Sequence, residues 1–339
     1  MSTSTLTPPK PDAATAAKAS PKASLRGSVR VILRAHRRSL WAAGALLGLG
    51  VGSAAALLIW VAADASKELC PDGDVTPCSD DVYTTTMGRN AAESVLSGGG
   101  SALLLLACLI GAFVAGPLIS RELESGTFRM AWAQSVSPAR WPAARLPVPA
   151  ALSVAGVGLL SLVQRWGWTQ LREKPSAFGL KWFDEGNFPG IGPVAVGYAL
   201  FAVAVGALCA LLIRRMLLSM AATTVVLAVV MAGATKRRWM LWPTDRLVGG
   251  GFPGNDTWMT EMGMLTASGE KLFWEDCKSS YEDPGAVDCL TAQGGVSDFT
   301  GYHPIGHFWP LQLVGTGILL ALAALAVFAA FRVLRRLHG

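Results

Sequence analysis

A run of charged residues directly after an apolar block is where this chain is best equipped to engage another molecule. Residues 116–141 read GPLISRELESGTFRMAWAQSVSPARW, with Glu122 and Glu124 just past the block. Gly126 breaks the run, and Thr127 can cap a new short helix. Such a helix can form specific ion pairs at the rim of a partner and move its two flanking helices as one body. The alternative is a loop that only sets topology and whose charges are solvated.

Two motifs resemble those of bacterial ABC exporter permeases of the second export class, which have the type V exporter fold. The first is ISRELESGTFRMAWAQSVSPARW, in which an acidic residue precedes Glu-x-Gly-Thr, an aromatic and basic stretch, and Ser-x-x-Arg-Trp. The second is YHPIGHFWPLQ, residues 302–312, which is similar to the high-GC Gram-positive branch of that group. The resemblance implies that the loop helix couples the membrane helices to a cleft of a separate ATPase. The implied coupling surface consists of Glu122, Glu124, Gly126, Thr127, Arg129 and Gln134.

The same resemblance implies the partners of the chain. A working unit would contain two permease domains, as a homodimer or a pair of paralogues, and two ABC ATPase subunits. The sequence has no G-x-x-x-x-G-K-[ST] run and so no phosphate-binding loop of its own. We therefore expect a transport subunit that is not an enzyme and binds no cofactor, with ATP and Mg on the partner. Membrane lipids are expected partners, and nucleic acid is not.

The elements that position this loop are blocks of apolar residues. The chain is 52% hydrophobic and only 15% charged, and the apolar residues are gathered rather than spread periodically. Blocks of about 20 apolar residues match a bilayer core of about 30 Å, and backbone groups in lipid must be satisfied within a helix. We therefore predict an all-α membrane protein with six transmembrane helices. The blocks are residues 39–63, 98–119, 142–162, 189–213, 216–234 and 309–331.

Charge predicts the orientation of these helices, because cytoplasmic loops carry an excess of Lys and Arg. With the N-terminus inside, 17 of the 29 Lys and Arg residues and 3 of the 23 acidic residues lie on the cytoplasmic side. We therefore expect a multi-pass protein of the bacterial plasma membrane with both termini in the cytoplasm. One triplet departs from this pattern, since Lys236, Arg237 and Arg238 follow the fifth block on the predicted outer side. They fit either a membrane interface or a segment that re-enters the membrane, and both alternatives stay open.

The rest of the chain divides around a six-helix permease domain, residues 39–334. Residues 1–24 lack an apolar period and are expected to be disordered. Residues 25–38 alternate apolar and Arg positions at helical spacing, which predicts an amphipathic helix on the inner leaflet. The predicted connections are outer loops 64–97, 165–188 and 235–308, and a cytoplasmic coupling loop 120–141. The outer loop between helices five and six is long enough for some fold of its own.

Four of the six cysteines lie in the predicted outer loops. Cys70 and Cys78 share the first of these loops, and Cys277 and Cys289 share the last. Disulfides persist outside the reducing cytosol, so two loop-local bridges are preferred among the three possible pairings. A metal site is the rival interpretation. It is disfavoured because no C-x-x-C spacing occurs, and we expect no metal.

The interiors of the apolar blocks hold no Asp, Glu, Lys or Arg. Ion-driven transporters need titratable groups there, so this pattern favours an energy source outside the membrane. Polar residues that could line a substrate path are Tyr198, Thr223 and Thr224. The chain is thus predicted to be the permease subunit of an ATP-driven exporter of an amphipathic or hydrophobic cargo, such as a drug, peptide antibiotic or lipid-like molecule. The alternative is a non-transporting sensor or scaffold acting through disulfide-bonded outer loops.

Overall fold

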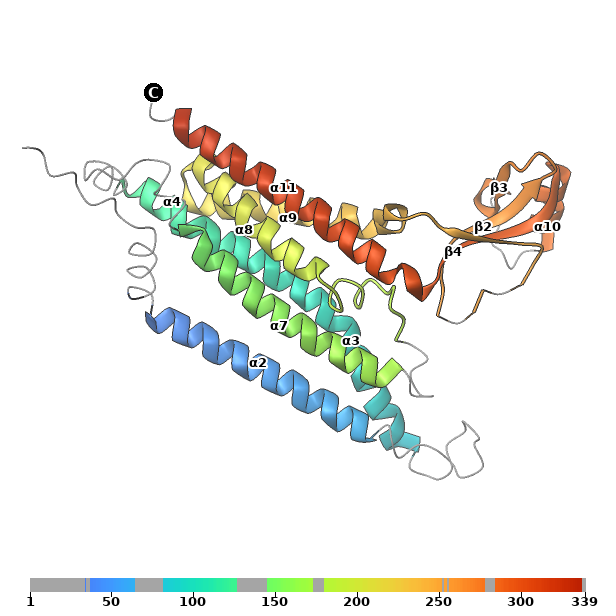
Figure 1. Cartoon of the computed structure of the whole chain (residues 1–339), viewed down its shortest axis with the longest axis horizontal. Helices are drawn as coiled ribbons and strands as arrows, with labels where there is room; N and C mark the ends of the chain where they lie inside the picture. Colours follow the sequence, from blue (N-terminus) through green and yellow to red (C-terminus); the bar gives the residue numbers. More distant parts are fainter. Residues whose placement is uncertain are drawn as a thin grey trace, which may run out of the picture.

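The computed structural model shows a bundle of long antiparallel helices with a small β-sheet unit projecting from one end (Figure 1). It describes residues 34, 37–64, 82–126, 145–172, 180–251, 253–254, 256–277 and 284–336. The tail 1–24, most of the predicted amphipathic helix 25–38, and Cys70 and Cys78 lie outside the described residues. The helices of the bundle are α2 (Arg37–Asp64), α3 (Val82–Leu109), α4 (Gly116–Glu124), α7 (Pro147–Arg172), α8 (Val194–Ile213), α9 (Met216–Arg237) and α11 (Phe308–Arg336).

Five helical stretches in the described part of the chain are long and apolar enough to cross a membrane. They are Ser94–Glu124, Pro147–Arg172, Val194–Ile213, Met216–Leu241 and Ile305–Arg336. Many of their Leu, Val and Phe side chains are exposed, as expected for helices whose outer faces meet lipid rather than water. Helix α2 is 28 residues long, and its apolar described part, Leu47–Trp60, is shorter than the other five.

Helix α8 lies at the centre of the bundle, and α3, α4, α7, α9 and α11 all pack on it. Most of its residues are buried, and many of them are Ala or Gly. Small side chains let helix backbones approach closely in membranes. The closest approach is to η2 (Ile110–Ala115), a π-helical turn between α3 and α4, where a Cβ on Gly206 would lie 2.3 Å from the carbonyl oxygen of Gly111.

The helices extend beyond the apolar blocks of the sequence. Residues 82–97, assigned above to an outer loop, form the start of α3, and α7 continues to Arg172. Polar residues can continue a helix once it leaves the hydrocarbon, because only its central part must be apolar. At the other end, α3 passes through η2 into α4, so residues 120–124 of the predicted coupling loop are helical. Helix α7 begins at Pro147, since proline suits the first turn of a helix, where no backbone N–H partner is needed.

The prediction of an all-α protein is wrong between α9 and α11, where a four-stranded antiparallel sheet forms. Its strand order is β1-β4-β2-β3, and the strands are β1 (Asp245–Val248), β2 (Trp258–Thr266), β3 (Lys271–Phe273) and β4 (Gly295–His303). Two of the strands are short, and all four mix polar with apolar residues. Strand propensity is strongly context-dependent, and β4 pairs with β1 across some fifty residues of chain, so local sequence gave little signal.

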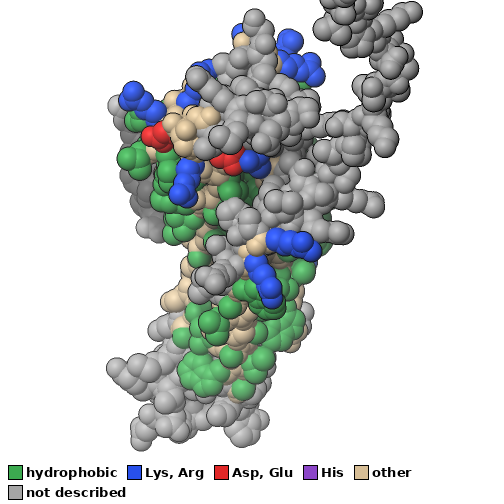
Figure 2. All heavy atoms as spheres, turned by 90° about the vertical axis from the view of Figure 1, so that its left-hand side faces the viewer, with side chains coloured by type: hydrophobic (Ala, Val, Ile, Leu, Met, Phe, Trp, Pro, Cys, Tyr) green, Lys and Arg blue, Asp and Glu red, His purple; other side chains and the backbone are tan. Residues whose placement is uncertain are grey.

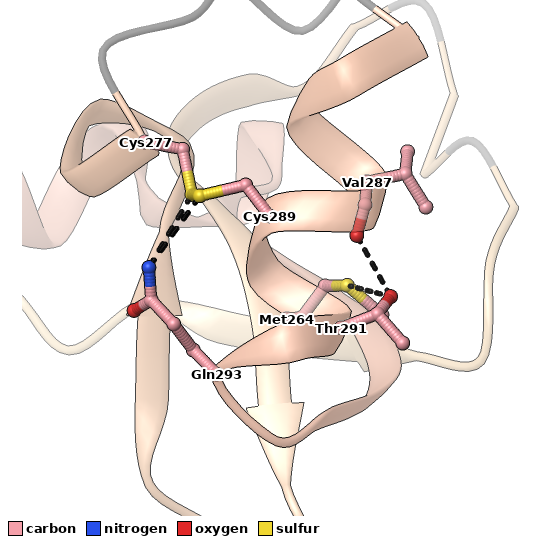
Figure 3. The surroundings of a disulfide bond; sticks show 6 residues. All are labelled: Met264, Cys277, Val287, Cys289, Thr291 and Gln293. Atoms are coloured by element: carbon pink, nitrogen blue, oxygen red, sulfur yellow. Dashed lines mark hydrogen bonds between the residues drawn. A yellow bond between two sulfur atoms is a disulfide. The ribbon is translucent and has the colours of Figure 1, made fainter.

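A disulfide holds the outer part of the sheet unit. Cys277 ends the 3-10 turn η4 (Trp274–Cys277), and Cys289 lies in α10 (Pro284–Ala292), with an S–S distance of 1.98 Å. The amide of Gln293 donates to both sulfurs (Figure 3). This confirms one of the two predicted bridges. A three-residue core of Met264, Trp274 and Leu290 lies beside it.

A pair of histidines joins the sheet unit to the bundle. His303, at the end of β4, is fully buried. Its Nε2 lies 2.9 Å from the backbone oxygen of Trp239 in η3 (Arg238–Leu241). Its Nδ1 lies 3.1 Å from Nδ1 of His307. A carbonyl oxygen can only accept, so Nε2 of His303 donates and its Nδ1 accepts from His307. His307 Nε2 is 3.9 Å from a carboxylate oxygen of Asp245 in β1. The motif YHPIGHFWPLQ thus ties η3, β1 and β4 to the start of α11.

Candidate functional site

Of the loop between α4 and α7, the structure describes only the two ends, residues 125–126 and 145–146. These ends, with the last turn of α4, are called the base of the loop below. Helix α4 ends at Glu124, with Ser125 as its C-cap, and Gly126 follows with φ +71°. That left-handed conformation favours glycine and is the usual way to end a helix. The break predicted at Gly126 therefore has a structural basis. Thr127, Arg129 and Gln134 lie outside the described residues, so the predicted coupling helix itself is not among the described elements.

Glu122 and Arg145 close the base of this loop. Arg145 Nη2 lies 2.5 Å from each carboxylate oxygen of Glu122, and Arg145 Nε lies 3.0 Å from Oε1. Both side chains are about a quarter to a third exposed. A multiply bonded Arg–carboxylate pair has fixed geometry as well as charge attraction. The pair links the last turn of α4 to the start of α7 and so fixes the two points from which the loop leaves the bundle.

Glu124 links the same base to a third helix. Its Oε2 accepts a hydrogen bond of 3.1 Å from the backbone N–H of Met216, the first residue of α9. A carboxylate is favourable there because the first N–H groups of a helix have no partners within it and carry partial positive charge. Arg214, with φ 55°, and Arg215 form the tight turn between α8 and α9. Glu122 and Glu124, predicted to lie on one partner-facing surface, are thus bonded to different helices of this chain.

This end of the bundle, called the basic end below, is rich in arginine. Figure 2 looks onto it and shows Lys and Arg side chains grouped around a few acidic ones. Beneath them, buried Ile119 and Leu123 of α4 pack with residues of α8 and α11. A displacement of the loop base would therefore reach α4, α7 and α9 through polar bonds and α8 and α11 through apolar contacts. The arginines of the described basic end are Arg34, Arg37, Arg121, Arg145, Arg214, Arg215, Arg332, Arg335 and Arg336.

A cavity of about 310 Å³ lies between α8, α9 and α11, towards the end of the bundle that carries the sheet. Its wall is mainly apolar and includes Tyr198, Val230 and Leu319. Charged residues line it only where α9 ends: Arg237, Arg238 and, from the segment before α8, Glu185. Helices α9 and α11 both pack on α8 and contact each other little, which leaves this space above α8.

Of the predicted path residues, Tyr198 lines the cavity, whereas Thr223 and Thr224 do not. Their hydroxyls donate to the backbone oxygens of Ser219 and Met220, four residues earlier in α9. Arg145 and the two cavity arginines were not predicted from the sequence as site residues. The signal for the latter was the basic triplet 236–238 at an otherwise acidic end. Among the residues that the structure describes, no cluster of His, Cys, Asp and Glu could hold a metal ion.

Long apolar helices packed around α8 define a multi-pass membrane protein. A family model described as "ABC-2 membrane transporter related" matches residues 45–238, and the chain belongs to this family. The match covers more than half of the chain, from α2 to the start of η3, and ends before the sheet unit. No curated protein and no solved structure matches the chain.

Proposed function

We propose that this chain is the permease subunit of an ATP-driven exporter, powered by a separate ABC ATPase that docks on the loop between α4 and α7. The observation that carries the proposal is the base of that loop. Glu122–Arg145 and Glu124–Met216 join α4, α7 and α9 at one point. A partner that moved this base would move three membrane helices together, which is what conversion of ATPase closure into transport requires.

The roles within the loop then divide in two. Glu122 and Glu124 hold the base, because their carboxylates already bind groups of this chain. Contact with the ATPase falls to the residues beyond Gly126, among them Arg129 and Gln134. The resemblance of this segment to the coupling loops of exporter permeases supports this division.

The membrane arrangement follows from the same proposal. Helix α2 runs antiparallel to α3 and parallel to α7 in the bundle and serves as the sixth span (Figure 1). The basic end lies in the cytoplasm, because arginine-rich segments are retained on that side. Both termini are then cytoplasmic, and the sheet unit with its disulfide lies outside, where disulfides persist. Two copies, or this chain and a paralogue, form the working unit with two ATPases.

The test is recovery of the ATPase from native membranes. The photo-crosslinking residue p-benzoylphenylalanine is placed at Arg129, and the matched control carries it at Val296, an exposed position in the sheet unit. Mass spectrometry of the crosslinked products should identify an ATP-binding-cassette protein from the Arg129 variant and none from the Val296 variant.

Two outcomes would refute the exporter proposal. One is recovery of the chain alone. The other is a kinase or a cell-wall enzyme crosslinked at Val296, which would favour a sensor or scaffold. That second candidate draws on one observation, the disulfide-bonded sheet unit that lies beyond the family match.

A further inference from the structure

The cavity between α9 and α11 is open on the side of the bundle that faces lipid. Val229 of α9 is 68% exposed, and Ile318 and Leu322 of α11 are 46% and 38% exposed, yet all three line the cavity. Deeper residues such as Val194 and Leu311 are buried. A molecule could therefore enter sideways from the hydrocarbon, without passing through water. Small-molecule sites span about 300–1,000 Å³, so this cavity, at the lower end, suits a single chain or a slim ring system.

The charged end of the cavity is built rather than incidental. Arg238 is only 8% exposed. Its Nη1 and Nη2 donate to the backbone oxygens of Asp184 and Phe183. Its guanidinium lies 5.0 Å from the ring centre of Phe188 and 4.9 Å from that of Trp258. Its Nε is buried and has no hydrogen-bond partner among the described residues. The structure therefore holds one guanidinium in place at the cavity and leaves one of its donors unused.

Arg237 supplies a second cation at the same rim. It is exposed and lines the cavity, whereas its neighbour Lys236 is exposed and does not. Glu185, also exposed, is the single carboxylate on the rim, and Asp184 lies beside Arg238 without lining the cavity. Two guanidinium groups against one carboxylate favour an anion. Arginine suits phosphate and carboxylate groups in particular because its donors match their geometry.

The distance along α9 sets the shape of the ligand. Arg237 and Val229 are eight residues apart, which corresponds to about 12 Å along a helix. The charged rim lies at the end of the apolar helix, where a membrane interface would be, and the apolar part extends from there towards the bilayer centre. We propose that this cavity binds an amphiphile with an anionic head, with its phosphate or carboxylate at Arg237 and Arg238 and one apolar chain between α9 and α11. The inference goes beyond the proposed function, because binding requires no ATPase.

The test measures binding of radiolabelled hexadecyl phosphate to the purified full chain in dodecyl maltoside micelles. Hexadecanol, which has the tail alone, and inorganic phosphate, the head alone, are the competitors. We expect saturable binding that neither competitor displaces at the same concentration. Displacement by a two-chain phosphatidic acid would assign the site to membrane phospholipid, and failure to displace would assign it to single-chain anions; both support the site.

Two pairs of matched variants locate the binding. Arg237→Gln should weaken it about tenfold, the size of one charge-assisted contact, whereas Lys236→Gln should leave it unchanged. Gly233→Trp should abolish binding, because Gly233 lines the cavity and has open space around its Cβ position, so the indole can fill the site without disturbing packing. Gly317→Trp, at an equally open position outside the cavity, should bind normally.

Equal affinity for hexadecanol, equal losses in the Lys236 and Arg237 variants, or normal binding by the Gly233 variant would each overturn the proposal. A failed crosslink at Arg129 would refute the exporter assignment and leave this result unaffected.

Discussion

The Glu122–Arg145 pair predicts how firmly the base of the loop is held. Replacing either residue with Gln removes one partner of a multiply bonded, partly buried ion pair. Hydrogen bonds to charged groups contribute about 1.5–3 kcal/mol, and exposed ion pairs about 0.2–1 kcal/mol. With side chains about a quarter to a third exposed, we expect a coupling energy between these limits, about 1–2 kcal/mol. Such a loss raises the open population of the loop base about five- to thirtyfold.

Hydrogen exchange of two backbone amides measures this opening. The N–H of Ser125 bonds to Arg121 in the last turn of α4, and that of Ala150 bonds to Leu146 in the first turn of α7. Both should exchange about five- to thirtyfold faster in the Glu122→Gln variant. A double-mutant cycle with Arg145→Gln isolates the pair, because other contacts of either residue cancel in the interaction term.

Two controls make this prediction refutable. The amide of Arg214, which bonds to Ala210 at the same end of the bundle, should be unaffected. Arg215→Gln, which removes an exposed arginine nearby, should change neither test amide. Additive effects of Glu122→Gln and Arg145→Gln would refute the coupling, and uniform acceleration at Arg214 would show general loosening of the bundle instead.

Three further predictions concern stability. Gly206→Ala should lower the free energy of unfolding in mixed micelles by about 1–3 kcal/mol, because its Cβ would lie 2.3 Å from a backbone oxygen of η2. Gly233→Ala, where the Cβ would have open space, should be neutral. Equal effects of the two changes would contradict this packing. Replacing Cys277 and Cys289 with Ser should destabilise the sheet unit by about 3 kcal/mol, since the bridge closes a 12-residue separation. A melting temperature of the native chain that is the same under reducing and oxidising conditions would count against this prediction. Burial lowers the pKa of His303 from its ordinary 6.5, so the unfolded chain binds more protons than the folded one. The contact between the sheet unit and the bundle should therefore lose stability as pH falls from about 6.5 through the folded pKa. His303→Gln should remove this pH dependence in thermal unfolding, and an unchanged pH profile would refute the prediction.

The sequence determined the membrane class and the approximate place of the long helices. A hydrocarbon core forces apolar residues into long blocks, and a block can be recognised without knowing its neighbours. The helix break at Gly126 was also predictable, because it depends on the backbone preference of one residue. The pairing of Cys277 with Cys289 followed from their closeness in the chain.

The tertiary structure decided what depends on residues distant in sequence. The sheet forms by pairing β4 with β1 and β2, and no local pattern specifies such partners. Glu122 was predicted to face a partner, but its carboxylate binds Arg145, which lies 23 residues later in the chain. The sequence left Arg238 either at a membrane interface or in a re-entrant segment, and packing buries it between two aromatic rings at a cavity. Charge and hydropathy fix which residues can lie at a membrane end, but only packing fixes which of them meet, because contact depends on where each helix lies on its neighbours.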